Sequence, residues 1–236
     1  MSEALVLVPG MMCDARLYAP QIEALSRERN VMVACATRGE RIEEIASNIL
    51  MGLPQKFALA GLSMGGIIAM EILRRAPERV TRLCLMDTNP LAETPQSAAG
   101  YEPMIVGVKA GRLEEVMRGF MKPDFLAPGP GRVKVLAMMA EMSRDLGPEV
   151  FLRQIRALQK RRDQQSTLRK CKVPTLVMCG AHDGLTPPKR HTFMAELIPY
   201  AKLEILDEAG HVPTLEAPER VTQALRDWLA QPFVLQ

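Results

Sequence analysis

Ser63 stands out as a candidate for chemistry, because it is a lone hydroxyl between two glycines in the apolar stretch FALAGLSMGGIIAM. The pentapeptide Gly61-Leu62-Ser63-Met64-Gly65 follows the strand-like run KFALAG and precedes the helix-like run MGGIIAMEILRR. A sharp turn between a strand and a helix can present a serine, provided that the residues two before and two after it lack a Cβ. The helix N-terminus also favours developing negative charge there. The stretch therefore predicts a nucleophile, rather than a serine that only caps a helix.

A serine hydroxyl is a weak nucleophile and needs a base. The chain offers three histidines. His191 lies in PPKRHTFMAEL, which predicts an exposed helix, and His182 stands beside an aspartate in CGAHDGLTPP. His211 follows the last strand-like run, in a loop before the closing helix, and loops of this kind are where α/β sheets collect reactive groups. We therefore expect His211 to be the base.

Two aspartates compete to orient that histidine. Asp183 follows the run TLVMCGAH, and Asp87 ends the run RLCLMD. Either carboxylate would accept the Nδ1–H of the base and stabilise its protonated form. Asp183 is preferred, because it stands in a short loop after a strand-like run, whereas Asp87 ends the preceding run. The order Ser63, Asp183, His211 is also the one expected when the serine motif is genuine. Asp87 stays open as the alternative.

Acyl transfer also needs two N–H groups aimed at one developing oxyanion. The residue after the nucleophile, Met64, supplies one from its backbone. The loop after the first strand-like run, VLVPGMMCD, should supply the other. Gly10 permits a turn there, and Met11 is the expected donor. Only the backbone acts, so the apolar side chains do not matter.

The elements that must position these residues follow a regular pattern. Continuous apolar runs, typical of strands covered on both faces, alternate with helix-like segments and predict a doubly wound, mainly parallel α/β sheet of six strands. The runs are 4–8, 30–36, 56–61, 82–87, 174–180 and 202–207. Helices are expected at Leu17–Ser26, Ile42–Leu50, Met64–Arg75 and Glu219–Leu229. Between about 92 and 170 only amphipathic helical pieces appear: Met104–Lys109, Arg112–Met121, Val133–Asp145 and Glu149–Arg162. We expect residues 1–91 and 171–236 to form the core and 92–170 a helical insertion.

Composition excludes several classes of function. The 236 residues fit one sizeable domain, and 47% hydrophobic residues can bury a full core. A net charge of +3 demands neither a nucleic acid nor a membrane as partner, and no run approaches the roughly 18 apolar residues of a membrane span. Few histidines and no clustered ligands argue against a metal, and no G-x-G-x-x-G follows a strand-like run. The five cysteines show no paired spacing, which favours a reducing cytoplasm. We expect no cofactor.

The basic stretch 153–172 is the one conspicuous charge run. Ile155 and Leu158 are spaced for a buried seam, which leaves the arginines facing water. A solvated helix face is the preferred interpretation. Contact with an anion or an acidic surface is the alternative, and it predicts salt-sensitive binding.

Taken together, the pieces LVPGMM, GLSMGG, GAHDGLTP and EAGHVPTLEAPERV resemble the α/β-hydrolase superfamily over nearly the whole chain. The resemblance implies Ser63 as nucleophile, His211 as base and Asp183 as acid, with Met11 and Met64 at the oxyanion hole. It also implies that the insertion is a helical cap over the active site. The family's usual histidine before the oxyanion-loop glycine is Pro9 here, and two N-terminal strands of larger members are absent.

The expected function is hydrolysis of a small to medium carboxylic ester through an acyl-enzyme on Ser63. Methionines of the insertion would suit flexible apolar acyl groups if they faced the site, but ordinary helix packing is the preferred interpretation for most of them. A C–C bond hydrolase or lactonase would use the same triad, and a non-catalytic small-molecule receptor would use the same pocket. The sequence leaves the oligomeric state undetermined.

Overall fold

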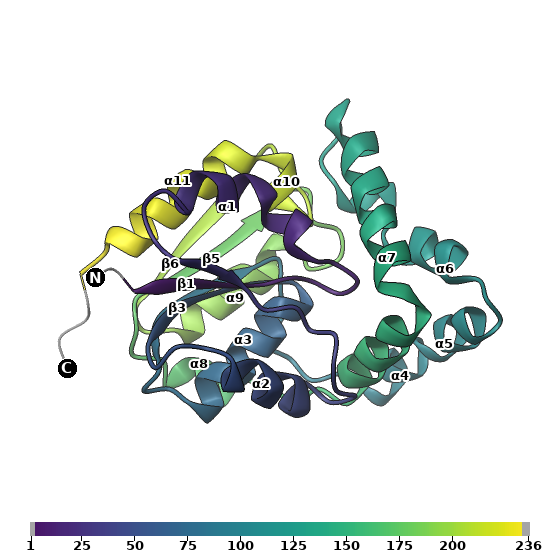
Figure 1. The fold of residues 1–236 in the computed structure, drawn as a ribbon, viewed down its shortest axis with the longest axis horizontal. Coiled ribbons are helices and arrows are strands. Elements are labelled where there is room, and N and C mark those ends of the chain that lie inside the picture. Colours follow the sequence, from purple (N-terminus) through teal and green to yellow (C-terminus); the bar gives the residue numbers. More distant parts are fainter. Residues whose placement is uncertain (1–2, 233–236) are drawn as a thin grey trace.

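The computed structural model describes residues 3–232, and within them six strands form one sheet in the order β2-β1-β3-β4-β5-β6 (Figure 1). All neighbouring strands are parallel. The strands are β1 (Ala4–Val8), β2 (Val31–Val33), β3 (Phe57–Leu62), β4 (Val80–Met86), β5 (Thr175–Gly180) and β6 (Ala201–Leu206). The predicted fold, an α/β class with a six-stranded parallel sheet, is confirmed.

The two edge strands differ from the inner four. All residues of β3 and β5 are buried, whereas those of β2 are only half-buried and β6 has exposed positions. Strand β2 covers Val31–Val33 instead of the predicted 30–36, because its one neighbour, β1, pairs with those three residues alone. An edge strand has no second neighbour to extend its pairing.

Alternate residues of the inner strands pack into two hydrophobic cores, one on each face of the sheet. Val6 and Leu59 belong to one core, while Leu5 and Ala58 belong to the other. This alternation follows from the two-residue period of a strand. Most side chains of these strands are apolar in both directions, which is why their sequences read as nearly continuous apolar runs.

Helices cover both faces, as Figure 1 shows. On one face lie η1 (Ala15–Tyr18), α1 (Ala19–Leu25), α10 (Pro213–Glu216) and α11 (Pro218–Ala230). On the other lie α2 (Ile42–Met51), α3 (Met64–Arg75), α8 (Gln165–Arg169) and α9 (Pro188–Leu197). The predicted helix at Leu17–Ser26 is divided into η1 and α1, because Asp14 caps the first turn and a proline opens the second helix.

The segment between β4 and β5 stands at one end of the sheet (Figure 1). It holds α4 (Pro95–Ala99), α5 (Glu102–Lys109), α6 (Leu113–Phe120), η2 (Pro123–Phe125) and α7 (Gly131–Gln159), and residues 92–170 contain no strand. Helix α7 is two helices across a break at Gly147, whose φ of 77° is left-handed. Pro148 follows it and opens the second half, so the break lies between the predicted helical pieces Val133–Asp145 and Glu149–Arg162.

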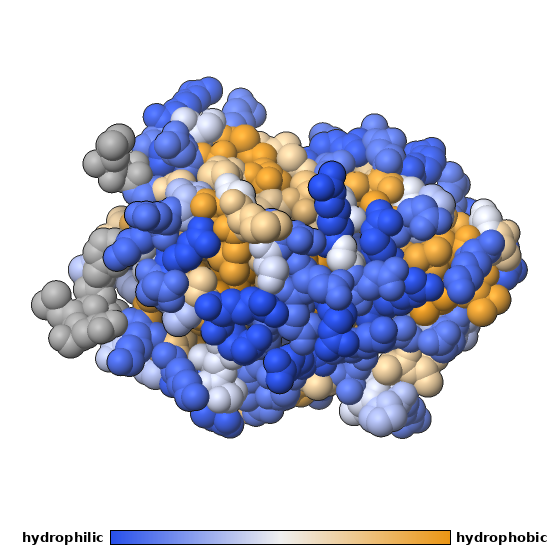
Figure 2. Space-filling model, turned by 60° about the horizontal axis from the view of Figure 1, so that its bottom comes forward, coloured by the Kyte–Doolittle hydropathy of each residue, from blue (hydrophilic) through white to orange (hydrophobic). Residues whose placement is uncertain are grey.

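The face that carries α2, α3 and α8 is largely hydrophilic, with apolar residues gathered in separate patches (Figure 2). Among the helices of residues 3–232, none combines the length and the apolar character that crossing a membrane requires.

Candidate active site

Ser63 lies between the last residue of β3 and the first residue of α3, with φ 55° and ψ −119°. This backbone conformation is rare for a residue with a side chain. The neighbouring glycines are required by close contacts: a Cβ on Gly61 would come within 2.2 Å of the Gly65 carbonyl oxygen, and a Cβ on Gly65 within 1.9 Å of the Val8 carbonyl oxygen. The strand, turn and helix predicted around Ser63 are therefore present.

His211 connects Ser63 with Asp183. It follows β6 and precedes α10, and its Nε2 lies 3.1 Å from Ser63 Oγ. On the other side of the ring, Nδ1 lies 2.9 Å from Asp183 Oδ2. The histidine and the aspartate are both buried, with 2% and 3% of their surfaces exposed. The structure thus brings together the three residues that the sequence singled out, in the relative positions of a nucleophile, a base and an orienting carboxylate.

Asp183 is held by its own loop. Its Oδ1 accepts hydrogen bonds from the backbone N–H groups of Leu185 and Thr186, and its Oδ2 accepts one from Thr186 Oγ1 as well as facing His211. Burial by itself would raise the pKa of Asp183, but the charge on His211 and these hydrogen bonds outweigh it and lower the pKa to about 2. The carboxylate is therefore ionised at neutral pH.

The side chain of Asp87, the alternative acid, lies next to Asp183 and His211 but forms a different hydrogen bond. Its Oδ1 accepts a hydrogen bond from the Gly180 N–H at 3.0 Å, whereas its buried Oδ2 has no hydrogen-bond partner among residues 3–232. No hydrogen bond joins Asp87 to His211 within those residues. Burial first, and then the charge on Asp183, raise the pKa of Asp87 well above its usual value. Of these two neighbouring carboxyl groups, Asp87 is thus the one whose surroundings favour the protonated form.

A metal ion fits this cluster poorly. Asp87, Asp183 and His211 are the one group of three within residues 3–232 whose ligand atoms all lie within 4.8 Å of one another. However, hydrogen bonds from protein donors already occupy both oxygens of Asp183, and burial raises the pKa of Asp87, which favours its protonated form. Metal binding requires deprotonated ligands with free lone pairs. These side chains are better described as a hydrogen-bonded set.

The two segments that carry the predicted oxyanion donors lie beside Ser63. Gly10 approaches so closely that a Cβ on it would sit 3.4 Å from the Ser63 Cβ, which brings the loop after β1 to the nucleophile. Met11 and Met64 line the same cavity as Ser63. Among residues 3–232, neither backbone N–H has a hydrogen-bond acceptor. Both donors are free for an oxygen atom of a substrate.

Ser63 opens into a cavity of about 210 Å³. Part of its wall comes from the core loops and part from the helical insertion, which contributes Tyr101, Phe120, Leu158 and Arg161. None of the insertion's methionines lines it. Met117, Met121 and Met139 instead line a separate cavity of about 450 Å³ between α6 and α7. Helix packing, the preferred interpretation of these methionines, agrees with this arrangement.

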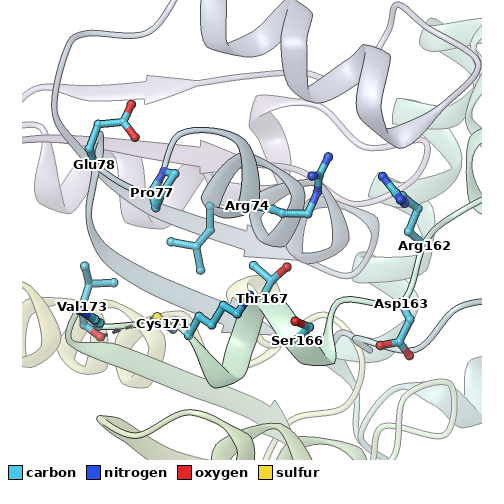
Figure 3. A pocket seen from close by; sticks show the side chains of 12 residues that line it. Arg74, Pro77, Glu78, Arg162, Asp163, Ser166, Thr167, Cys171 and Val173 are labelled. Atoms are coloured by element: carbon cyan, nitrogen blue, oxygen red, sulfur yellow. Dashed lines mark hydrogen bonds between the residues drawn. The ribbon is translucent and has the colours of Figure 1, made fainter.

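Another cavity, of about 640 Å³, lies at the C-terminal end of α3 and along α8 (Figure 3). Arg74, Arg162 and Thr167 are among the residues around it. It shares no lining residue with the cavity of Ser63 and contains no histidine, so it offers no base for the serine.

Two details differ from the sequence-based expectations. His191 is on a helix, α9, but it is fully buried instead of exposed, because its Nε2 accepts the backbone N–H of Thr88 at 2.9 Å. Burial lowers the pKa of His191 to about 4. Arg161 does not face water either: its side chain is 10% exposed and forms an ion pair with Glu93. The seam at Ile155 and Leu158 is buried as expected.

Glu216 is a residue at the site that sequence reasoning missed. Its Oε2 accepts hydrogen bonds from the backbone N–H groups of Gly210 and Val212, on either side of His211. Its Oε1 accepts one from Ala127 in the insertion. The His211 N–H itself donates to the Phe125 carbonyl at 2.7 Å. A glutamate five residues after a candidate histidine was the available signal, but its contact with the insertion needs the fold.

Comparisons with known proteins show the family to which the chain belongs. A family model described as "Alpha/beta hydrolase family" matches residues 5–224. The chain is 24% identical over 238 residues to a pimeloyl-(acyl-carrier protein) methyl ester esterase of Vibrio parahaemolyticus, covering 95% of this chain and 93% of that protein. It is 27% identical over 202 residues to the protein of the same name from Aromatoleum aromaticum, covering 80% of each.

Solved structures give the same picture. A thermophilic esterase from Thermogutta terrifontis superposes with a TM-score of 0.88 at 28% identity, over 97% of this chain and 90% of that one. The enol-lactonase from Burkholderia xenovorans superposes with a TM-score of 0.85 at 23% identity, over 98% and 92% of the two chains. At its lower identity, the similarity to the enol-lactonase shows the fold alone.

Proposed function

The chain belongs to the alpha/beta hydrolase family, and we propose that it hydrolyses small to medium carboxylic esters through an acyl-enzyme on Ser63. The observation that carries this proposal is the continuous line of hydrogen-bonding groups from Ser63 Oγ through the His211 ring to Asp183, with distances of 3.1 and 2.9 Å. That line is what a serine needs to become a nucleophile at neutral pH.

In the first half of the reaction, Ser63 Oγ attacks the ester carbonyl while His211 Nε2 takes its proton. Asp183, ionised and hydrogen-bonded to Nδ1, stabilises the imidazolium and keeps the ring in the tautomer whose Nε2 accepts. The carbonyl oxygen gains negative charge between the Met11 and Met64 N–H groups. Collapse of this intermediate breaks the ester C–O bond, and the imidazolium gives its proton to the departing alcohol.

In the second half, His211 removes a proton from water, which attacks the acyl carbon and releases the carboxylic acid. Ser63 recovers its proton from the imidazolium. Glu216 and Phe125 hold the backbone around His211 by hydrogen bonds, and this keeps the His211 ring beside Ser63 throughout the reaction. No cofactor enters these steps.

The substrate class rests on the relatives and on the cavity. The curated relatives named above are methyl ester esterases, and a similar solved structure is an esterase. A cavity of about 210 Å³ fits an acyl or alcohol group of a few carbons beside Ser63. We propose that residues 92–170 act as the cap, because Tyr101, Phe120 and Leu158 of that segment close the cavity opposite the core. A cytoplasmic location remains our proposal, and it rests on the five free cysteines.

The experiment that tests this function is labelling with a fluorophosphonate, followed by intact-mass measurement and peptide mapping, together with hydrolysis of p-nitrophenyl acetate and butyrate. Wild-type protein should carry one adduct on Ser63 and turn over both esters. Ser63→Ala should carry none, and His211→Ala should react at least about a thousandfold more slowly. A folded wild-type protein that neither reacts nor turns over would leave a small-molecule receptor as the better description.

A further inference from the structure

The cavity of Ser63 contains a largely buried ion pair that ester hydrolysis itself does not use. Arg161, in the loop after α7, lies 2.8 Å from Glu93, in the loop before α4, and their side chains are 10% and 8% exposed. Both line the same cavity as Ser63. A buried pair of this kind is costly to build, so its position beside the nucleophile calls for a physical reason.

The two partners differ in how completely their hydrogen-bonding groups are used. The Glu93 carboxylate faces three donors, since Ser97 Oγ and Tyr101 Oη donate to it in addition to its contact with Arg161. Burial raises the pKa of Tyr101 to about 12, so the phenol keeps the proton that it donates. Arg161, in contrast, carries five N–H groups, and its buried Nε has no hydrogen-bond partner among residues 3–232.

The charge of the ion pair determines which kind of ligand could accept hydrogen bonds from Arg161. The guanidinium charge is already balanced by Glu93, so a second anion would meet the Glu93 carboxylate at short range. A neutral oxygen can accept from the remaining N–H groups without that repulsion. An unsubstituted alkyl chain would leave the Arg161 Nε–H without a partner, which is the situation that a polar site rejects most strongly.

We propose that Arg161 binds a neutral carbonyl or hydroxyl oxygen of the substrate, so that esters with an oxo or hydroxy group in one arm are preferred over alkyl esters of the same length. This inference rests on the proposed function, because it takes Ser63 as the nucleophile at the other side of the cavity. It makes Arg161 a specificity-determining residue and Glu93 the group that selects against anionic substrates.

The first test compares esters that differ only in the oxo group. In the acyl arm, methyl 4-oxopentanoate is compared with methyl pentanoate, and in the alcohol arm, 3-oxobutyl acetate is compared with butyl acetate. Wild-type protein should show a preference in kcat/KM of about tenfold or more for the oxo ester in one arm. The double variant Arg161→Met with Glu93→Gln removes both charges together, so that no unpaired charge is left buried. It should lower the preference to within about twofold.

The matched control is the next residue along the chain. Arg162 has 59% of its side chain exposed and points into the other cavity, between α3 and α8 (Figure 3). Arg162→Met removes the same kind of side chain without touching the cavity of Ser63. It should therefore keep the wild-type preference for the oxo ester.

The second test uses charge alone. Monomethyl succinate has the shape of methyl 4-oxopentanoate, with a carboxylate in place of the acetyl group. Wild-type protein should discriminate against it. Glu93→Gln leaves Arg161 with an unbalanced positive charge, and the ratio of kcat/KM for monomethyl succinate to that for methyl 4-oxopentanoate should rise about tenfold or more. The corresponding pair in the alcohol arm is 3-acetoxypropanoate and 3-oxobutyl acetate.

The outcomes separate this inference from the function on which it rests. If wild-type protein hydrolyses p-nitrophenyl acetate but shows no oxo preference in either arm, the inference is overturned while the function stands. The same holds if the double variant keeps the preference, and the ion pair would then only join the two ends of the insertion. If wild-type protein hydrolyses no ester at all, the proposed function and the inference both fail.

Discussion

Asp87 and Asp183 carry carboxyl oxygens within 4.8 Å of each other, both buried, and both within the same distance of a ring nitrogen of His211. Two carboxylates so close in a buried place cannot both ionise at low cost. The hydrogen bonds to Asp183 decide the outcome: its pKa falls to about 2, while burial and the neighbouring charge raise the pKa of Asp87. The surroundings of the pair thus favour the ionised form of Asp183 and the protonated form of Asp87.

Exchanging each aspartate for asparagine tests this division of roles. Asp183→Asn should lower kcat for p-nitrophenyl acetate by about 10³–10⁴-fold, because an amide neither stabilises the imidazolium nor holds the productive tautomer. Asp87→Asn should keep kcat within about tenfold, because an amide of nearly the same shape replaces a carboxyl group that, among residues 3–232, forms no hydrogen bond with His211. The opposite result, an active Asp183→Asn and an inactive Asp87→Asn, would make Asp87 the orienting acid.

Replacement of Gly65 tests the close packing at the turn. A Cβ at Gly65 would come within 1.9 Å of the Val8 carbonyl oxygen, a backbone atom that cannot move without shifting β1. Gly65→Ala should therefore lower the free energy of unfolding by about 3 kcal/mol or more, measured by urea denaturation. Gly119→Ala is the control. Gly119 is exposed on α6, where an added Cβ would meet no atom within 4 Å, and alanine there should raise stability by about 0.5–1 kcal/mol. Equal effects at both positions would contradict the contact.

The sheet and the central residues of the site could be predicted from the sequence because their signals are local. A strand buried on both faces is a continuous apolar run, and the turn around Ser63 needs glycine at two fixed positions, so both can be recognised without the fold. The position of His211 after the last strand follows from the common direction of parallel strands, whose carboxyl ends meet at one edge.

The features that escaped prediction depend on contacts between distant segments. Nothing near His191 in the sequence reveals that it accepts the Thr88 N–H, a contact across 103 residues. Arg161 stands in a run of basic residues that mostly face water, and its inward turn depends on Glu93 at the other end of the insertion. Helix α7 ends at Gln159, short of the predicted Arg162, which gives the chain the turn that carries Arg161 into the cavity.

Stability should depend on pH through His191. Burial holds its pKa at about 4 in the folded protein, below the ordinary histidine value of 6.5. Between these values the unfolded chain binds more protons than the folded one, so stability falls as pH falls from 6.5 to 4. From about pH 7.5 to about pH 5 this group should remove about 2 kcal/mol from the free energy of unfolding.

The variant His191→Gln isolates this contribution. Glutamine can accept the Thr88 N–H but does not titrate, so urea denaturation at the two pH values should show a smaller acid loss by about 2 kcal/mol than in wild type. The remaining titratable groups act alike in both proteins and cancel in the comparison. The same acid loss in wild type and variant would assign it to other groups.

The backbone of Ser63 should carry strain that the protein keeps for the sake of reactivity. A φ of 55° with a ψ of −119° is easily reached by glycine but costs a residue with a Cβ about 1–3 kcal/mol. Ser63→Gly and Ser63→Ala both remove the hydroxyl, so both should be inactive. They differ in the Cβ, and Ser63→Gly should be the more stable of the two by about 1 kcal/mol in urea denaturation, even though glycine usually lowers stability through the entropy of the unfolded chain. If Ser63→Ala were instead the more stable variant, the turn would hold Ser63 without strain. The position of the hydroxyl in the cavity would then come from the close packing of Gly61 and Gly65 alone.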